Sequence, residues 1–491
     1  MPAEPIKLTL RGSPRECLKI GVEHGRTLRN QIRSQISIYE AMFEYTSKLS
    51  WPDVREVAKD FQPALMKLVP DIYAEMEGIA EGAELEILDI VALNCRSEIA
   101  LGKFSDGCTT LCWKKSDNAR VLSQNWDWAS PIGKNIAMIS IEQLDKPTLY
   151  MVTEAGLVGK IGFNSAGVGT CLNAIRAKPM ISSKLPIHVA LRLCLESVSV
   201  DAAVKTLEAL GGVASAQHIL VADSTTALAL ELSPVGNKYI PEDEAGLIPH
   251  TNHFIENRYV EEPPWLSGSP IRLKRVKDLA LGLIANGTSG DAITPSLLRE
   301  QIFSDTFNVP QAICCQEDQA VHVSIRDNTL FNIVMNLEPG RVGAEVVFGR
   351  PGSGEEGPVF KMPWLIHRPW FVPSTPSLGF EACFAMNKTL NAKAEWEKCI
   401  RLITHVIVGL GHQPSQPSHE VLESLESVQF KFEGLLLMAD PEYQYASDTL
   451  TTGRITIQRE KARLAKDPQS FEDVMRNMTD MLSSMQARNI F

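Results

Sequence analysis

Positive charge and long apolar runs are both scarce in this sequence, and each scarcity excludes a class of partner. The 48 Lys and Arg residues are outnumbered by 59 Asp and Glu residues, which gives a formal net charge of −11. A nucleic-acid-binding surface needs clustered Lys and Arg, so we expect no nucleic-acid partner. No apolar stretch approaches the about 20 residues that cross a bilayer, so we expect no membrane partner.

Targeting signals are also missing from the sequence. The first five residues, Met-Pro-Ala-Glu-Pro, lack the basic start and the apolar core of a secretory signal. Residues 488–491 read Arg-Asn-Ile-Phe, which is not a peroxisomal address of the Ser-Lys-Leu type. We therefore expect a cytoplasmic protein.

The ten cysteines show no spacing typical of a disulfide framework. Without a secretory signal, they are expected to be reduced intracellular thiols. Cys108 and Cys112 form a tight pair, but no second pair and no nearby histidine accompanies it at ligand spacing. The pattern therefore predicts no metal site.

Four segments differ in composition and periodicity over the 491 residues. Residues 1–107 are expected to be an N-terminal segment that is mainly helical from residue 6, because apolar side chains recur at helical spacing. Residues 108–352 alternate between strand and helix patterns. Five prolines within 353–378 indicate a linker. Residues 379–491 show three helical patterns and predict a helical tail, to which the sequence assigns no function.

A hairpin is expected where the second segment begins. Thr109–Trp113 and Arg120–Trp128 are short apolar runs, and the polar residues between them are typical of a turn. Cys108 stands at the start of the first strand and Asp127 at the end of the second. Because these ends are neighbours in an antiparallel pair, we expect the thiol and the carboxylate to lie close together.

Further strands and helices alternate along the second segment. Strands are predicted at Met138–Leu144, Thr148–Val152, Gln217–Ala222, Ala227–Leu232, Phe331–Leu337 and Val342–Phe348, and helices at Pro186–Val198, Asp201–Leu210 and Pro270–Ala285. Ser269 is the expected N-cap of the last helix. This order fits two sheets between helical layers, although the pattern alone predicts only an α+β fold.

A cysteine directly after a glycine can cut its own chain. The Cys108 thiol can attack the carbonyl of Gly107, and hydrolysis of the resulting thioester frees a new α-amine on Cys108. Glycine tolerates the close, strained backbone best. The α-amine has a pKa near 7.7 to 8.0 in peptides, so it can take the proton of the thiol without a histidine. An inert buried thiol is the alternative interpretation.

A series of short strings occurs in one order over residues 8–352. The strings are Gly12-Ser13-Pro14, Gly21-Val22-Glu23-His24-Gly25, Asn94-Cys95-Arg96-Ser97-Glu98, Asp106-Gly107-Cys108-Thr109-Thr110, Gln124-Asn125-Trp126-Asp127, Thr153-Glu154-Ala155-Gly156, Gly162-Phe163-Asn164-Ser165-Ala166-Gly167-Val168, His250-Thr251-Asn252-His253, Leu330-Phe331-Asn332-Ile333 and Gly349-Arg350-Pro351. Together they resemble the acyl-coenzyme A:isopenicillin N acyltransferase family of fungi. The resemblance implies the N-terminal-nucleophile hydrolase fold, a four-layer αββα sandwich, here with a C-terminal helical extension.

The resemblance also implies roles for particular residues. Cys108 would be the nucleophile, Asn252 the oxyanion donor, and Ser233 a serine required for processing and activity. Asp127 would hold the freed amine or the entering amine, and Thr109 would contact the substrate with it. Taken singly, the three residues are better explained by structural roles: Asn252 as a turn residue, Asp127 as a strand-end cap and Ser233 as a helix or turn cap. Beside Gly107-Cys108 in the order of the family, the functional roles are favoured.

Three functions stay open on these grounds. The first is a self-cleaving enzyme, an α/β heterodimer from one precursor, that moves an acyl group from acyl-CoA to an amine in secondary metabolism. Acyl-CoA would be a co-substrate, and no cofactor is expected. The second is an amidohydrolase of the same fold, and the third is an inactive binding protein. Where the family often has Ser-Ile-Cys-Arg, this chain has Ala312 and Cys315 at the two outer positions, so its substrate is expected to differ.

Overall fold

The computed structural model describes residues 5–364, except for 14–15, 101–106, 144–145 and 264–266. The chain divides into two units, Met1–Pro376 and Ser377–Phe491. The second unit, and with it the predicted helical tail 379–491, lies outside the described residues. All that follows concerns the first unit.

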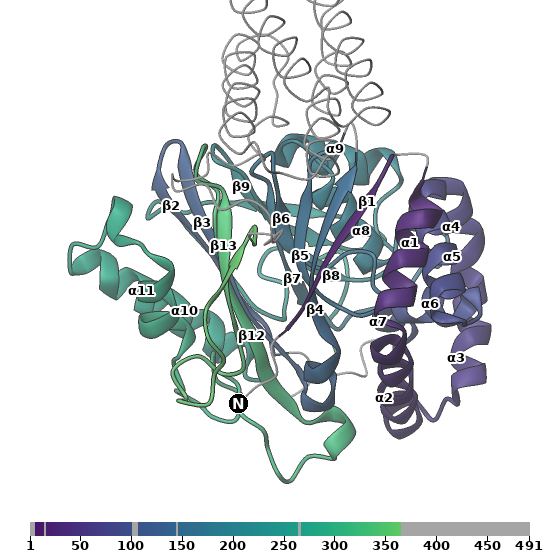
Figure 1. The fold of residues 1–491 in the computed structure, drawn as a ribbon. Helices are drawn as coiled ribbons and strands as arrows, with labels where there is room; N and C mark the ends of the chain where they lie inside the picture. Colours follow the sequence, from purple (N-terminus) through teal and green to yellow (C-terminus); the bar gives the residue numbers. More distant parts are fainter. Residues whose placement is uncertain (1–4, 14–15, 101–106, 144–145, 264–266, 365–491) are drawn as a thin grey trace, which may run out of the picture. The chain divides into compact units, whose positions relative to one another are not determined.

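Two sheets form the centre of the first unit (Figure 1). The eight-stranded sheet contains, in spatial order, β1 (Ile6–Gly12), β4 (Ile136–Gln143), β5 (Leu149–Glu154), β6 (Ile161–Asn164), β7 (Gly169–Ala174), β8 (Gln217–Ala222), β9 (Ala227–Leu232) and β10 (Lys238–Pro241). The six-stranded sheet contains β11 (Leu247–His250), β2 (Thr109–Ser116), β3 (Ala119–Ala129), β12 (Asp327–Asn336), β13 (Gly343–Phe348) and β14 (Phe360–Met362).

Helices cover the outer faces of both sheets. On the side of the eight-stranded sheet lie α1 (Cys17–Thr27), α2 (Arg29–Ser47), α3 (Trp51–Ala58), α4 (Gln62–Leu68), α5 (Pro70–Ala83), α6 (Ile87–Asn94), α7 (Arg96–Ile99), α8 (Ile187–Leu195) and α9 (Val200–Ala209). On the side of the six-stranded sheet lie α10 (Ser269–Ala285) and α11 (Pro295–Leu298) (Figure 1). The predicted α+β class and the four-layer αββα order are therefore confirmed.

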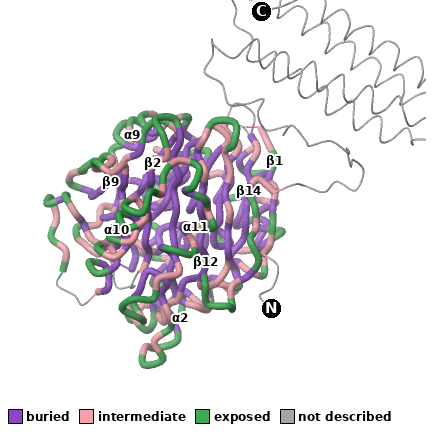
Figure 2. Tube along the Cα trace, turned by 90° about the vertical axis from the view of Figure 1, so that its left-hand side faces the viewer, coloured by how far each residue is buried: buried purple, intermediate pink, exposed green. Residues whose placement is uncertain are grey.

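Burial explains the composition of the central strands. Every residue of β3 is buried, as is every residue of β5 and β8. A sheet between a second sheet and a helical layer is buried on both faces, so the polar residues of its strands, among them Gln124, Asn125 and Asp127 of β3, are buried together with the apolar ones. In Figure 2 the buried segments run through the middle of the unit and the exposed ones lie at its periphery. No helix among the described residues is both long and apolar enough to cross a membrane.

The predicted hairpin is confirmed. β2 and β3 are antiparallel neighbours, with Thr109 opposite Asn125. Continuing this register by two residues sets Gly107 opposite Asp127, as the sequence predicted for the two strand ends. The other six predicted strands and three predicted helices are also present, with small shifts of their ends.

The structure adds one strand to the mainly helical N-terminal segment and differs from two other predictions of local structure. β1 lies in the segment predicted to be mainly helical, and it pairs with β4 in parallel; the alternation of buried Leu8 and Leu10 with less buried neighbours is a strand period. Ser269 is not the N-cap of α10 but its first residue, after Gly268. β14 lies within the predicted linker 353–378 and pairs with β13, while residues 365–378 lie outside the described residues.

Candidate active site

Cys108 lies directly before β2, buried between the two sheets. The residue is 1% exposed, so its environment is set by the protein rather than by water. Two side chains donate hydrogen bonds to its carbonyl oxygen: Asn173 Nδ2 at 3.0 Å from β7 and Arg272 Nη1 at 2.6 Å from α10. The backbone of Cys108 is thus held from both sides of the six-stranded sheet.

The junction between Gly107 and Cys108 packs against the carboxylate of Asp127. A Cβ atom built on Gly107 would lie 2.8 Å from Asp127 Cβ and 2.8 Å from Asp127 Oδ2. Such a contact is shorter than real side chains show, so only glycine allows this approach. The structure therefore brings the predicted nucleophile, the predicted cleavage site and Asp127 together.

Thr329 fixes the Asp127 carboxylate from the neighbouring strand β12. The Thr329 hydroxyl donates to Asp127 Oδ1 at 2.6 Å and accepts a hydrogen bond from the backbone N–H of Cys315 at 2.9 Å. Because the hydroxyl has one hydrogen and its oxygen already accepts from Cys315, the direction of the bond to Asp127 is determined. All three residues are buried. The carboxylate is therefore oriented by a chain of two hydrogen bonds.

Asn252, in the turn after β11, joins the same site through Arg272. Its side-chain Oδ1 accepts from Arg272 Nη2 at 3.0 Å, and its Nδ2 donates to the carbonyl of Ala174 at 3.0 Å. Its backbone N–H donates to Ser269 Oγ at 2.7 Å, so the Ser269 hydroxyl holds the turn that contains Asn252 and does not cap α10. One guanidinium thus connects the Cys108 carbonyl with Asn252.

Thr109 and Ser233 make contacts within the protein, and the roles that the resemblance implies for them stay predictions. The Thr109 hydroxyl accepts a hydrogen bond from Arg272 Nη1 at 3.1 Å, so it holds a protein side chain in this structure. The Ser233 hydroxyl donates to the carbonyl of Gly236 at 2.6 Å and accepts from its N–H at 3.1 Å. It makes no hydrogen bond with Cys108 or Asp127. Its contacts are those of a turn cap after β9, the alternative that the sequence left open.

A buried ion cluster lies on the other side of Cys108 and consists of Arg96, Glu154 and Lys160. Lys160 Nζ is 3.0 Å from Glu154 Oε1 and lies 4.1 Å from the centre of the Trp126 ring. Arg96 Nη2 also pairs with Glu154. Burial lowers the pKa of Lys160 to about 8. Glu154 opposes this shift by raising the pKa, and Cys108 raises it more weakly. Burial would raise the pKa of Glu154, but Arg96 and Lys160 hold it below its usual range.

A cavity of about 100 Å³ opens beside the Gly107 end of the site. Its lining comprises Gly107, Ser267, Gly268, Arg272, Pro310, Gln311, Ala312, Cys315, Gln316, Asp318, Val321, Ile325 and Asp327. The two positions that depart from the family pattern, Ala312 and Cys315, are therefore in the wall of this cavity. Burial raises the pKa of the Cys315 thiol well above its usual value, so that this second cysteine is a neutral thiol.

Sequence reasoning missed Asn173, Arg272 and Thr329. Each touches Cys108 or Asp127 from a distant part of the chain. Asn173 has one local signal, because a polar residue in an otherwise apolar strand is expected to have a hydrogen-bonding partner. Arg272 lies in the predicted helix Pro270–Ala285, where the sequence did not indicate that this cation is buried. Among the described residues, no group of His, Cys, Asp and Glu could hold a metal ion.

Comparisons with known proteins identify relatives of this chain. The sequence model of the family described as acyl-coenzyme A:6-aminopenicillanic acid acyl-transferase matches residues 113–351. The acyl-coenzyme A:6-aminopenicillanic-acid-acyltransferase 40 kDa form of Emericella nidulans is 34% identical over 355 residues, which are 72% of this chain and 94% of that protein. Penicillin V acylase from Agrobacterium tumefaciens aligns in structure with a TM-score of 0.36 and 14% identity, over 49% of this chain and 83% of that one. The chain belongs to the acyl-coenzyme A:6-aminopenicillanic acid acyltransferase family.

Proposed function

We propose that this protein cuts itself between Gly107 and Cys108 and then transfers acyl groups from an acyl-CoA thioester to an amine. The observation that carries the proposal is the junction itself. Gly107 stands where a side chain would collide with Asp127, and a buried cysteine follows it. Two side chains donate hydrogen bonds to the carbonyl oxygen of Cys108, and Thr329 orients the Asp127 carboxylate.

This geometry supports self-cleavage by an attack within the junction. Cys108 Sγ attacks the Gly107 carbonyl carbon, the C–N bond breaks, and the nitrogen leaves as the α-amine of Cys108. Water then hydrolyses the thioester, which leaves Gly107 with a carboxylate and Cys108 with a free thiol. The Asp127 carboxylate, packed on Gly107, is placed to stabilise the ammonium form of the new amine.

Transfer uses the amine that cleavage creates. The α-amine takes the proton of the Cys108 thiol, the thiolate attacks the thioester carbonyl, and CoA leaves with that proton. An amine then attacks acyl-Cys108, the C–S bond breaks, and the thiol is restored. The Asn252 amide has two hydrogens, of which one binds the Ala174 carbonyl, so the second can serve the developing oxyanion. A fixed donor of this kind is worth about 3 kcal/mol.

The acceptor need not be the one named in the relatives. Their names specify 6-aminopenicillanic acid. In this chain the cavity wall carries Ala312 and Cys315, a methyl group and a neutral thiol, where the family pattern has a hydroxyl and a guanidinium. We therefore propose an amine whose recognition does not depend on a cation at that position, within secondary metabolism.

The decisive experiment is intact-mass analysis of freshly purified protein. We expect two pieces, of 107 residues and of the remaining 384 of 491. Cys108→Ala should abolish cleavage and turnover, while Cys108→Ser should retain slow cleavage because a hydroxyl can make the same shift. Product analysis with and without an amine separates transfer from hydrolysis. A parent protein that stays whole, with turnover unaffected by Cys108→Ala, would refute the proposal.

A further inference from the structure

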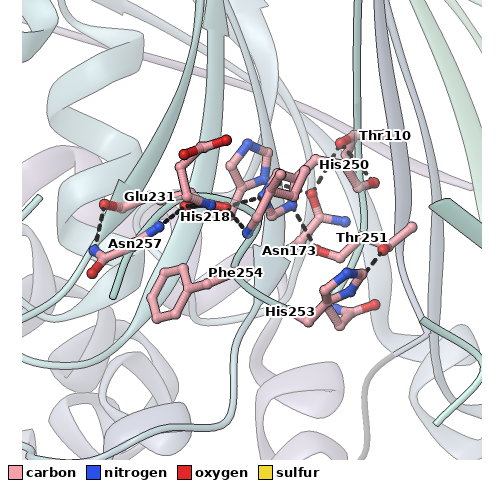
Figure 3. A network of polar contacts seen from close by, with 12 residues as sticks. Thr110, Asn173, His218, Glu231, His250, Thr251, His253, Phe254 and Asn257 are labelled. Atoms are coloured by element: carbon pink, nitrogen blue, oxygen red, sulfur yellow. Dashed lines mark hydrogen bonds and ion pairs between the residues drawn. The ribbon is translucent and has the colours of Figure 1, made fainter. Parts of the chain in front are cut away.

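A polar network between the two sheets joins Asn173 to four side chains that the proposed chemistry does not use (Figure 3). Thr110 comes from β2 and His250 from β11 in one sheet, and Asn173, His218 and Glu231 come from β7, β8 and β9 in the other. All five residues are at most 1% exposed. Burying this many polar groups costs more free energy on folding than burying apolar ones, which suggests that the network has a function.

Asn173 connects the network to Cys108. Its Nδ2 donates to the Cys108 carbonyl at 3.0 Å, while its Oδ1 accepts from His218 Nδ1 at 2.7 Å. The Thr110 hydroxyl lies 3.0 Å from the same Oδ1. With donors on one end of the amide and an acceptor at the other, only one orientation of the Asn173 side chain satisfies all of them.

The tautomer of His218 is fixed in turn. Its Nδ1 faces the Asn173 oxygen and must carry the hydrogen, whereas its Nε2 is buried without a hydrogen-bonding partner in the structure. The ring stacks on His250 with 3.5 Å between the ring centres and 11° between the planes. Burial, followed by the charge of His250, holds the pKa of His218 well below its usual value. A neutral His218 donor is the result.

His250 is held between two acceptors. Its Nε2 lies 2.9 Å from Glu231 Oε1 and its Nδ1 lies 2.7 Å from the Thr251 carbonyl. Glu231 Oε2 also accepts from the backbone N–H groups of residues 256 and 257, at 2.9 and 2.6 Å. The turn that contains Asn252 is thus anchored on both sides.

We infer that His218, stacked on His250, is a positioning residue that orients the Cys108 backbone through Asn173. The inference rests on the proposed function. Once the bond to Gly107 is cut, Cys108 is attached to the chain on one side only, so rotation about its remaining bonds can move both thiol and amine. Hydrogen bonds to its carbonyl fix the peptide plane, and with it the directions in which the two reacting groups point.

The test compares two variants of the full-length enzyme. His218→Phe keeps an aromatic ring on His250 but removes the donor to Asn173, whereas His218→Asn gives up the stack but keeps an amide N–H near the position of Nδ1. We expect kcat to fall about 10- to 100-fold in the Phe variant, the range that misplacement of reacting groups by up to 1 Å produces. KM should stay close to the parent value, and the Asn variant should recover most of kcat. If His218 only stabilised the fold, the loss of kcat in each variant would parallel the decrease in its melting temperature.

A further variant tests the same contact if His218→Phe does not fold. If His218→Phe is insoluble, Asn173→Ser, which removes the amide without adding bulk, should show the same loss of kcat with little change of KM. Equal kcat values in the parent and His218→Phe, or losses in the two His218 variants that follow melting temperature alone, overturn the inference while the parent remains active. A parent that neither cleaves nor turns over refutes the proposed function, and the inference falls with it.

Discussion

Replacing Gly107 by alanine tests the geometry of the junction most directly. The added Cβ would lie 2.8 Å from Asp127 Cβ and Oδ2, whereas ordinary contacts begin at 3.4 Å. Either Asp127 or the backbone of the junction must therefore move by about 0.6 Å or more. A misplacement of about 1 Å at reacting groups costs about a hundredfold in rate, so we expect self-cleavage to slow by about 10- to 100-fold.

The cleaved fraction of Gly107→Ala should behave differently. After cleavage residue 107 is a chain end that can move away from Asp127, so the turnover number per cleaved molecule should equal that of the parent. A time course of translation in a cell-free system, followed by gel and intact mass, gives the rate of cleavage, and the purified cleaved fraction gives the turnover number. Gly282→Ala is the matched control, because a Cβ on Gly282 would meet nothing within 4 Å. Cleavage of Gly107→Ala at the parent rate would show that Asp127 does not pack on the junction as described.

Three more perturbations test other parts of the first unit. Thr329→Val removes the donor to the buried Asp127 carboxylate, a loss of about 1.5–3 kcal/mol that should slow cleavage and turnover about 10- to 150-fold, while Thr329→Ser should restore both rates. Arg192→Met leaves Glu75 buried and uncompensated, so urea unfolding should show a loss of about 3–5 kcal/mol, most of which Glu75→Met in the same chain should recover. Burial lowers the pKa of His24 and that of His253 to about 4, so the contribution of these neutral histidines to stability is present above about pH 6.5 and is lost as the pH falls toward 4. Urea unfolding at a series of pH values should show the free energy of unfolding decline over this range. A free energy of unfolding that stays constant would contradict the prediction.

The distance along the chain decides which parts of the site could be predicted. Cys108 and Asp127 belong to one hairpin, whose strands and turn are encoded locally, so their proximity follows from the sequence. Arg272 reaches the Cys108 carbonyl across 164 residues, and Thr329 reaches Asp127 across 202. Such contacts depend on the order of strands in the sheet and on where α10 packs. No local pattern specifies either of these.

Local chemistry also misleads where a polar residue has two possible partners. Ser269 followed by a proline is typical of a helix start, yet its hydroxyl accepts from the backbone of Asn252 and so serves the site. Ser233 shows the reverse, since the resemblance implied a role in processing and its hydroxyl closes a turn with Gly236. In both cases the sequence indicated that the serine hydroxyl makes a hydrogen bond, but it did not indicate with which group. Only the fold decides between a nearby backbone group and a distant one.

The two faces of β2 make different contacts around Cys108. On the face toward α10, Thr109 contacts Arg272, and Gly107 packs on Asp127. On the face toward the eight-stranded sheet, Thr110 contacts Asn173 and thereby the stacked histidines. Because side chains of a strand alternate between faces, a change on one face leaves the contacts of the other in place. Gly107→Ala should therefore slow cleavage without changing turnover of the cleaved enzyme, and His218→Phe should lower turnover even in molecules that have already been cut. The cleaved fraction of the double variant should have the turnover number of His218→Phe, whereas a turnover number that differs from it would mean that the two faces of the strand are coupled.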